Sequence, residues 1–417
     1  MNPLRRGPAR DRRPRALSRA SLTSITAAAV SLVAAGCVDV GTGPGKHGDR
    51  PLNRRLVAEG QEIFRFDTFG DDVYWTDTLR LHEVIASTVS PALALDVGLK
   101  VDVDALPDEV LDAIVSGDVD LQDPQTTVTL LKLGSVVGVQ GTVENIDGRD
   151  TLTSVGITCA LCHSTVDNSF TAGIGRRLDG WPNTDLNVGA IVALSPAIDP
   201  GLRAILQSWG PGRYDPRINI DGKNTPLVIP PAFGLRGVEL ETYTGDGPIS
   251  YWNAYVAVTQ MHGKGTFVDP RLGIRVINVP DEVTPKLRAL LEYQLSLTTP
   301  RPPPGSFDPV AAERGKKLFR GVARCSSCHL PGDHFTDVNR GKLHRPEETG
   351  MDPAYARRTA TGRYRTTPLR ALWQHPPYFH DGSAATLEEV VEHYDAELDL
   401  RLTERQKADL VEYLRTL

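Results

Sequence analysis

CALCH at residues 159–163 and CSSCH at residues 325–329 are the two stretches that decide the fold of this chain. In each, two thiols three positions apart can reach the two vinyl groups on one edge of a porphyrin. The imidazole that follows then falls beneath the iron as the proximal ligand. The pattern predicts two covalently bound haem c groups. The residues expected to hold them are Cys159, Cys162 and His163 for the first haem, and Cys325, Cys328 and His329 for the second.

Three other uses of these cysteines fit the sequence less well. Disulfides would suit an exported protein, but they give no reason for a histidine after both pairs. A zinc site built from both pairs would need reduced thiolates, which an oxidising compartment opposes. A thioredoxin-like pair would need a βαβ setting, and the sequence shows no sign of one. The chain has five cysteines, so haem attachment uses every one except Cys37.

The first 36 residues have the pattern of a signal peptide. Seven arginines fall within the first twenty residues, and an uncharged, weakly apolar run follows from Ala20 to Gly36. The run ends in small residues before Cys37, which resembles a bacterial lipoprotein cleavage box with Ala34 in place of the usual leucine. The sequence therefore predicts an exported, periplasmic protein that is lipid-anchored through Cys37; a plain secretory signal is the alternative.

Charge limits the class of partner. Removing residues 1–36 takes seven Arg and one Asp from a chain with 46 basic and 52 acidic residues, which leaves a net charge of −12. This argues against nucleic acid, and it leaves a lipid anchor as the one route to a membrane. The expected partners are a soluble redox protein or small electron donor, together with hydrogen peroxide.

Four short segments recur in the same order in the two halves of the chain, which predicts two copies of one haem-binding unit. The pairs are 60–65 with 315–320, 224–227 with 366–369, 243–247 with 378–382, and 290–293 with 410–413.

The first copy carries a long insertion. Phe319 lies six residues before Cys325, whereas Phe64 lies ninety-five before Cys159, which leaves 89 extra residues. Within them, 106–115 is predicted to be helical and 136–143 to form a strand or hairpin. The insertion is expected either to decorate the surface or to act as a partner dock or lid over one haem.

The expected fold class is mainly α, with two cytochrome c-like haem domains that arose by duplication and a mixed insertion in the first. Proline-rich residues 298–305 form a stiff spacer between the domains. Capping boxes are predicted at Thr386 with Glu389 and at Thr403 with Gln406, each opening a helix. The boundaries are 1–36 for the signal peptide, 37–52 for a flexible tether, 53–299 for the N-terminal domain with its insertion at about 66–155, and 300–417 for the C-terminal domain.

Residues 310–417 resemble the bacterial dihaem cytochrome c peroxidase family, and within it the MauG-like branch. The resemblance rests on TPLR at 367–370, PYFHDG at 377–382 and ATLEE at 385–389. It implies an oxidoreductase with an N-terminal catalytic haem that meets peroxide and a C-terminal electron-transfer haem. Family members also place a tryptophan between the haems, for which Trp181, Trp209, Trp252 and Trp373 are candidates.

The resemblance also suggests a distal ligand for the second haem. Family members supply it from the helix after the His-Asp-Gly turn, as Met in the peroxidases and Tyr in the MauG-like branch. The matching position, fourteen beyond His380, is Tyr394, which could equally be a packed core tyrosine. Met351 and His375 are rivals, whereas His380 is expected to brace the turn.

The first haem has no such clear ligand. The peroxidases place a distal histidine soon after the first motif, but no histidine occurs here between His163 and His262. The repeat carries the Tyr394 position to Thr259, close to Met261 and His262. If Met261 or His262 binds the iron, the protein is a non-catalytic electron carrier with both irons six-coordinate. If neither does, the iron keeps an open face, and the catalytic acid or base above it is unknown from sequence.

Overall fold

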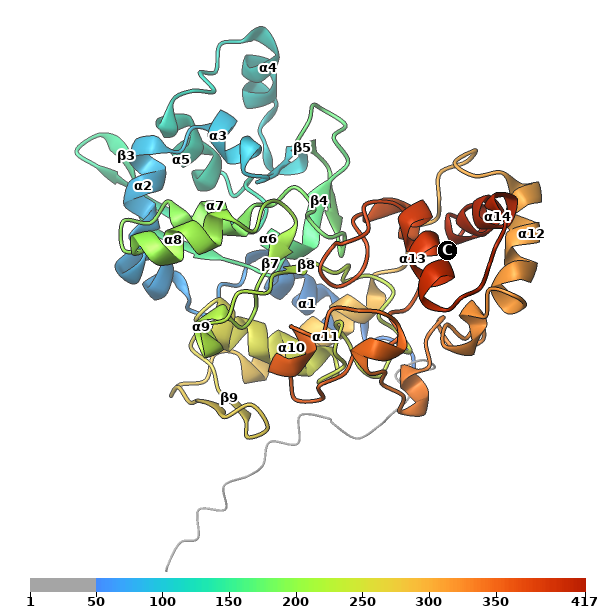
Figure 1. The fold of residues 1–417 in the computed structure, drawn as a ribbon. Coiled ribbons are helices and arrows are strands. Elements are labelled where there is room, and N and C mark those ends of the chain that lie inside the picture. Colours follow the sequence, from blue (N-terminus) through green and yellow to red (C-terminus); the bar gives the residue numbers. More distant parts are fainter. Residues whose placement is uncertain (1–49) are drawn as a thin grey trace, which may run out of the picture. The chain divides into compact units, whose positions relative to one another are not determined.

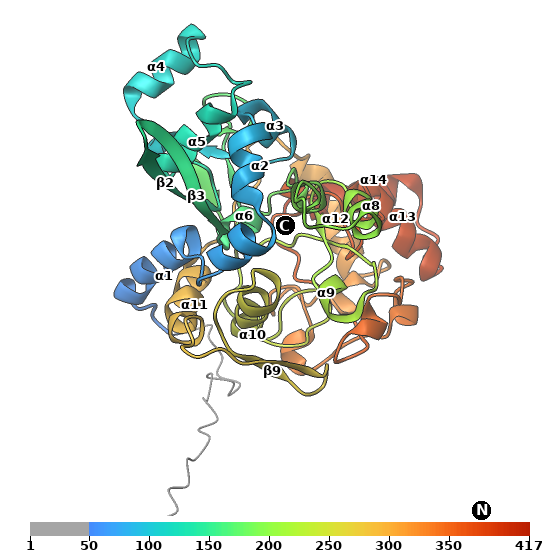
Figure 2. The ribbon, with the colours of Figure 1, turned by 90° about the vertical axis from the view of Figure 1, so that its left-hand side faces the viewer.

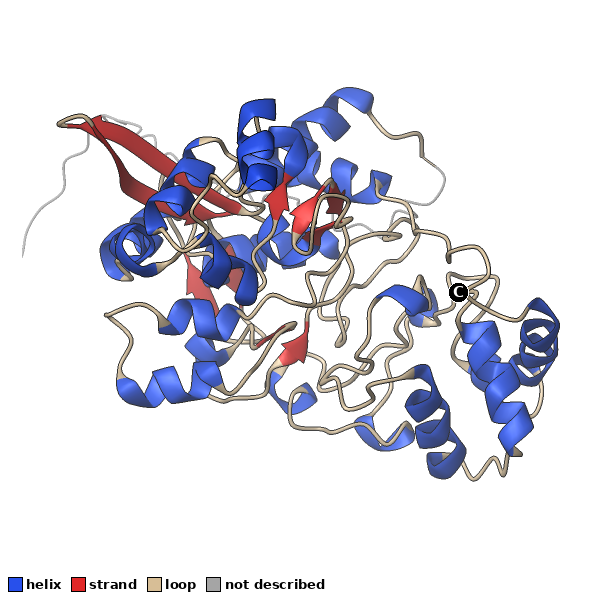
Figure 3. Ribbon diagram, turned by 90° about the horizontal axis from the view of Figure 1, so that it is seen from above, coloured by secondary structure: helices blue, strands red, loops and turns tan. Residues whose placement is uncertain are grey.

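The structure is a computed structural model that describes residues 50–417 (Figure 1). The predicted signal peptide and Cys37 lie outside the described residues. Most elements are helices of one to three turns joined by long loops, as the view by secondary structure shows (Figure 3), and every sheet among the described residues has two strands. The prediction of a mainly α-helical chain is confirmed.

Two helices from opposite ends of the first half cross at close range. Helix α1 (Arg54–Phe66) is capped by Asn53, whose side chain accepts from two backbone N–H groups of the first turn. The helix packs against α11 (Leu287–Ser296). A Cβ at Gly60 would stand 2.0 Å from the carbonyl oxygen of Ala289, so only glycine allows this approach. The rings of Phe64 and Tyr293 meet beside it, 5.4 Å apart.

A second crossing in the C-terminal half is built from the same residue types. Helix α12 (Pro309–Arg320) packs against α14 (Glu404–Leu414). A Cβ at Gly315 would stand 1.9 Å from the carbonyl oxygen of Asp409. The rings of Phe319 and Tyr413 lie 5.2 Å apart. In each crossing, therefore, a glycine sets the distance between the helices and a Phe–Tyr pair fills the space beside it.

The segment between α1 and the first cysteine motif holds helices and a hairpin. The hairpin pairs β2 with β3 in antiparallel register, with a bulge after Thr142. The helix predicted at 106–115 is α4, which begins at Asp108. The elements of the segment are η1 (Tyr74–Thr78), α2 (Leu81–Thr88), α3 (Pro91–Asp96), β1 (Val101–Asp102), η2 (Val103–Ala105), α4 (Asp108–Ser116), α5 (Pro124–Lys132), β2 (Val139–Ile146) and β3 (Arg149–Ile157).

This segment supplies most of one buried cluster. Its helices α2, α3 and α5 lie close together in Figure 2. The cluster includes Val128 and Leu131 of α5, Val139 of β2, and Leu161 from between the first two motif cysteines. Gly138 lies directly against Leu161, because a Cβ there would stand 2.2 Å from the Leu161 Cα. The segment therefore packs against the first motif.

The rest of the chain consists of short elements joined by loops. From the first motif to residue 296 they are α6 (Ala160–His163), β4 (Ser164–Val166), β5 (Ile174–Gly175), β6 (Arg177–Asp179), α7 (Val188–Ala193), α8 (Pro200–Gln207), β7 (Arg213–Tyr214), α9 (Ile218–Asp221), β8 (Leu227–Val228), α10 (Ile249–Tyr255), η3 (Val256–Gln260), β9 (Phe267–Asp269), β10 (Ile274–Val276) and η4 (Thr284–Lys286). After α12 come η5 (Cys325–Ser327), η6 (Val338–Arg340), η7 (Pro346–Glu348), η8 (Ala356–Arg358), η9 (Leu372–Gln374) and α13 (Leu387–Glu397).

One of the two predicted capping boxes is complete. At the start of α14, the Thr403 side chain accepts from the Gln406 N–H, and the Gln406 side chain accepts from the Thr403 N–H. At the start of α13, Thr386 accepts from the Glu389 N–H, but the Glu389 carboxylate accepts from the N–H of Ala385. The Glu389 carboxylate therefore accepts from the residue before the N-cap Thr386, one position earlier than a capping box requires. Between residues 50 and 417, no helix combines the length and the apolar character needed to cross a membrane.

Candidate haem-binding sites

The first motif forms a short helix at the end of the hairpin. Cys159 and Cys162 are half-buried free thiols, and burial raises the pKa of each to about 12. His163 lies 3.1 Å, through Nδ1, from the carbonyl oxygen of Pro230. A carbonyl oxygen can only accept, so Nδ1 carries the proton and Nε2 keeps its lone pair, which is the form that binds metals. Burial lowers the pKa of His163 to about 4, which keeps the ring neutral at pH 7.

The second motif repeats this arrangement. His329 lies 3.0 Å, through Nδ1, from the carbonyl oxygen of Phe335, and burial lowers its pKa. Cys325 and Cys328 are free thiols, and burial raises the pKa of Cys325 to about 11. Two thiols with one neutral, oriented imidazole fit covalent haem attachment at both motifs.

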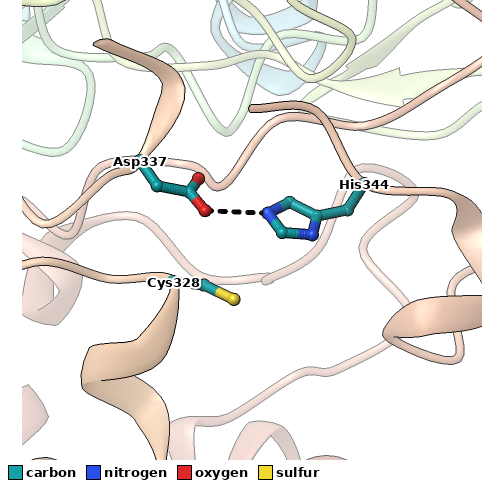
Figure 4. A group of neighbouring side chains, drawn as sticks. All are labelled: Cys328, Asp337 and His344. Carbon is teal, nitrogen blue, oxygen red and sulfur yellow. Dashed lines mark hydrogen bonds and ion pairs between the residues drawn. The ribbon is translucent and has the colours of Figure 1, made fainter. Parts of the chain in front are cut away.

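One group of side chains beside the second motif has the spacing of a metal site (Figure 4). Cys328, Asp337 and His344 place one ligand atom each within 4.8 Å of one another, the only such group found in residues 50–417. His344 Nε2 lies 3.0 Å from Asp337 Oδ2, and its Nδ1 lies 3.1 Å from Glu348. Because Cys328 would form a thioether with haem, its sulfur could not also serve as a thiolate ligand. The group therefore forms a polar edge of the second site.

Tyr394 is placed next to the second motif. It lies on α13, and its ring is 5.8 Å from that of Phe379. Burial raises the pKa of Tyr394, and the nearby Cys325 and Cys328 sulfurs raise it further. The phenol therefore lies within electrostatic reach of both attachment cysteines.

The rivals of Tyr394 have other partners. His380 is buried, and its Nε2 lies 3.0 Å from the hydroxyl of Tyr364. His375 directs Nε2 at the carbonyl oxygen of Arg370, at 3.2 Å. Met351 packs against a separate buried cluster that includes Tyr364. Neither imidazole offers that nitrogen to a metal in this arrangement, which leaves Tyr394 as the best-placed candidate.

Met261 and His262 lie at the end of η3, near the first motif. Met261 is buried in the cluster that contains Ala160, and its carbonyl oxygen accepts from the indole N–H of Trp75 at 3.1 Å. His262 stacks on Tyr74 with ring centroids 3.6 Å apart, and burial lowers its pKa. Met261 is therefore held in an apolar interior, while His262 lies against an aromatic ring.

Sequence reasoning missed a polar network beside the first motif. The Tyr214 hydroxyl donates to Gln260 Oε1 at 2.5 Å, and Gln260 Nε2 donates to the hydroxyl of Thr259 at 2.8 Å. Burial raises the pKa of Tyr214, and the nearby Cys162 sulfur adds to the shift. The sequence offered one signal for this network, the position of Gln260 directly before the candidate ligand Met261. Nothing in the sequence around Tyr214 indicates that it lies near the first haem motif.

Two of the four candidate tryptophans meet. Trp181, from just after the first motif, and Trp373, from the C-terminal half, lie edge to face with ring centroids 5.8 Å apart. The Trp373 indole nitrogen is buried without a hydrogen-bond partner. By contrast, the Trp209 N–H donates to Asn224 and the Trp252 N–H donates to the Glu241 carbonyl oxygen. Among the four candidate tryptophans, the pair that joins the two halves is therefore Trp181 and Trp373.

Two buried arginines share one buried carboxylate. Arg365 and Arg370 both pair with Glu241, at 3.0 Å and 3.2 Å, and all three side chains are buried. The Nε of Arg365 has no hydrogen-bond partner. A buried guanidinium needs an anionic partner, and haem propionates are anions that fit the excess positive charge. Arg177, which follows the first motif in sequence, pairs with Asp102.

Similarity to curated proteins agrees with the resemblance inferred from residues 310–417. The chain is 33% identical over 129 residues to the methylamine utilization protein MauG of Methylorubrum extorquens, and 32% identical over 111 residues to the cytochrome c551 peroxidase of Nitrosomonas europaea. It is 29% identical over 150 residues to a cytochrome c peroxidase of Denitromonas iodatirespirans. The predicted similarity to the MauG-like and dihaem peroxidase family is confirmed.

These similarities cover part of each protein. Each match spans 25% of this chain and between 33% and 40% of the relative. Among solved structures, the chain is similar to a MauG-like protein associated with microbial copper homeostasis, with a TM-score of 0.32 and 21% identity over 47% of this chain and 74% of that one. It is also similar to a chain of the hydrazine synthase of Kuenenia stuttgartiensis, with a TM-score of 0.35 and 18% identity over 51% and 78%. No protein-family profile matches the chain.

Proposed function

We propose that this chain is a dihaem c-type cytochrome that acts as a peroxidase-like or MauG-like oxidoreductase. The observation that carries the proposal is the repeated geometry of His163 and His329. Each donates Nδ1–H to a backbone carbonyl next to two free thiols, and so presents Nε2 for iron. The similarity to MauG and to cytochrome c peroxidases supports the choice of enzyme class.

The two haem units are copies of one ancestral domain, spanning residues 53–299 and 300–417. The two helix crossings support this, because Gly60 and Gly315 occupy matching places with the Phe–Tyr pairs beside them. Since the insertion packs against Leu161, we assign it a supporting role at the first haem site rather than a decorative one.

The first site receives hydrogen peroxide, and the second relays electrons to it. Haem iron, when bound, supplies the redox chemistry; reduction of peroxide to two waters consumes two electrons and two protons. Tyr214, Gln260 and Thr259 form the hydrogen-bonded network that would orient a polar substrate beside the first motif. Trp181 and Trp373 supply aromatic contact between the halves, and Tyr394 would bind the iron of the second haem.

A second function remains supported by one observation. Met261 is buried in the cluster around the first motif, where a thioether could reach iron. With Met261 as a sixth ligand, the first haem would be closed, and the protein would be an electron carrier.

We also propose that the protein is exported to the periplasm and held there by a lipid on Cys37. The support is the arginine-rich leader and the small residues before that cysteine. A C37S variant that leaves the membrane fraction, while a control variant at another leader residue stays, would support the anchor. Retention of C37S in the membrane fraction would contradict it.

The enzyme proposal is tested by peroxide turnover. Haem-loaded protein is mixed with hydrogen peroxide and a reduced cytochrome c or dye, and donor oxidation is followed. We expect turnover that falls at least tenfold in W373F, because the aromatic contact with Trp181 is weakened. W209F is the matched control, since the Trp209 ring packs against Tyr214 of its own half. Absence of turnover in the wild type would contradict the enzyme reading.

A further inference from the structure

The insertion contains a cavity that the proposed function does not use. Its volume is about 470 Å³, and it lies among α2, α3, α4, α5 and the strands β1 and β2. This is roughly three times the ~150 Å³ apolar cavity that binds benzene. It also falls within the roughly 300–1,000 Å³ range of small-molecule sites.

The walls of the cavity are apolar, with acidic side chains among them. Aliphatic side chains from every bordering helix line it, among them Ile85, Leu95, Ile114 and Leu130. Four carboxylate residues join the lining, and none of the lining residues is Lys or Arg. They are Glu109, Asp118, Asp120 and Asp123, all exposed. An apolar interior favours an apolar ligand, and the carboxylates repel an anion.

One buried polar group in the lining lacks a partner. Thr127 of α5 is 5% exposed, and its hydroxyl makes no hydrogen bond. Buried hydroxyls in native proteins are nearly always hydrogen-bonded, so this unpartnered one stands out in the lining. The pairing of a large apolar space with a single unpartnered hydroxyl is the usual composition of a small-molecule site.

Helices α5 and α4, which both line the cavity, differ in how deeply they are buried. On one side, α5 buries Thr127, Val128, Leu130 and Leu131. On the other, none of the nine residues of α4 is buried, although Val110, Ala113 and Ile114 line the cavity. Figure 2 shows α4 at the outer end of the insertion, beyond α5. A helix with few buried contacts can open at low cost, which gives a ligand a route inside.

We propose that the insertion binds an uncharged, largely apolar small molecule carrying one hydrogen-bonding group, with α4 as its cover and Thr127 as its polar contact. The site and the first haem motif are joined by one buried cluster. Leu131, Val139 and Ile174 line the cavity, and they belong to the same buried cluster as Leu161. The bound molecule therefore contacts side chains that support the first attachment motif. This binding does not depend on peroxidase activity.

The probe for the test is N-phenyl-1-naphthylamine, an uncharged aromatic with one N–H donor. Its binding to the haem-loaded protein is measured by equilibrium dialysis, so that haem absorbance does not interfere. We expect one molecule per chain. Ala113→Trp should fill the cavity and weaken binding at least tenfold. Val115→Trp is the matched control, because Val115 lies on the same helix, is 75% exposed and does not line the cavity; it should bind within twofold of wild type.

A competition experiment needs no variant, and so holds even if Ala113→Trp fails to fold. 1-Decanol should displace the probe at a concentration at least tenfold below that of decanoate, because the carboxylates disfavour the anion. The proposal is overturned if the probe does not bind, if folded Ala113→Trp binds it as well as Val115→Trp, or if decanoate competes as well as decanol.

Discussion

The carbonyl oxygen of Pro230 lies 3.1 Å from Nδ1 of His163, and this contact decides which nitrogen His163 can offer to iron. Pro230 is far from the motif in sequence, yet it fixes both the tautomer and the direction of the ring. An imidazole held in this way is pre-organised as a metal ligand before any cofactor is attached. This favours haem over a disulfide or a thiol redox pair, because neither of those gives the oriented histidine a role.

Removal of the cysteines of one motif should remove one haem. We expect two haems per chain in the wild type by the pyridine haemochrome assay, and one in each of C159A/C162A and C325A/C328A. The haem count of C37S should stay at two, since that cysteine belongs to neither motif. A wild-type count of one, or a count of two in either double variant, would contradict the assignment.

The two helix crossings should be equally intolerant of a methyl group. Gly60→Ala and Gly315→Ala would each place a Cβ about 2 Å from a backbone oxygen. Overpacking of this kind costs roughly 1–3 kcal/mol of unfolding free energy, and backbone cannot move aside as a side chain can. Gly332→Ala is the control, because nothing lies within 4 Å of its position. Denaturant unfolding measures all three, and no loss in either crossing variant would contradict the geometry.

Asp71 should make the unfolding free energy depend on pH. Its carboxyl is fully buried, and this burial raises its pKa from 3.8 to about 9. Between about pH 4 and pH 9 the folded chain therefore holds a proton that the unfolded chain has lost. This proton contributes its full stabilisation below the pKa of Asp71 in the unfolded chain. The contribution is lost as the pH rises through the pKa of Asp71 in the folded chain, and the unfolding free energy falls by up to about 1.4 kcal/mol per pH unit.

Asp71→Asn mimics the protonated acid and should flatten that pH dependence. Its unfolding free energy should exceed that of wild type at pH 9 and approach it at low pH. Asp77→Asn, at an exposed position of η1, should follow the wild-type curve. Parallel curves for wild type and Asp71→Asn from pH 5 to 9 would show that Asp71 is ionised in the fold.

Tyr394→Phe should change the optical and EPR spectra of one haem and leave the other unchanged. The phenol lies near Cys325 and Cys328, so its loss removes the proposed distal ligand of the second haem. Tyr378→Phe is the control, because that hydroxyl donates to the Leu372 carbonyl oxygen at 2.7 Å. Identical spectra for wild type and Tyr394→Phe would make Tyr394 a packing residue.

The parts of the site that sequence predicts are those with short, fixed spacing. The CALCH and CSSCH motifs place their own ligands, and the offset from His380 to Tyr394 spans one turn and one helix. Helix α4 and the cap at Thr403 were likewise predictable, because each depends on neighbours a few residues away.

Contacts between distant segments were not predictable in this way. Trp181 and Trp373 were two of four equal candidates until the fold brought them together, and Pro230 carries no sign that its carbonyl oxygen orients His163. Tyr214 and Gln260 meet only because β7 and η3 lie side by side in the fold. The cavity in the insertion depends on the packing of four helices, which no local pattern records.

The most direct test of the central claim, an open first haem beside a six-coordinate second one, is an EPR spectrum of the haem-loaded protein, recorded fully oxidised and again after adding one electron. The account predicts one high-spin and one low-spin iron in the oxidised protein, or a high-spin signal that emerges on half-reduction. Two low-spin irons in the oxidised protein, with no high-spin iron after half-reduction, would contradict it and leave an electron carrier in which Met261 or His262 closes the first haem.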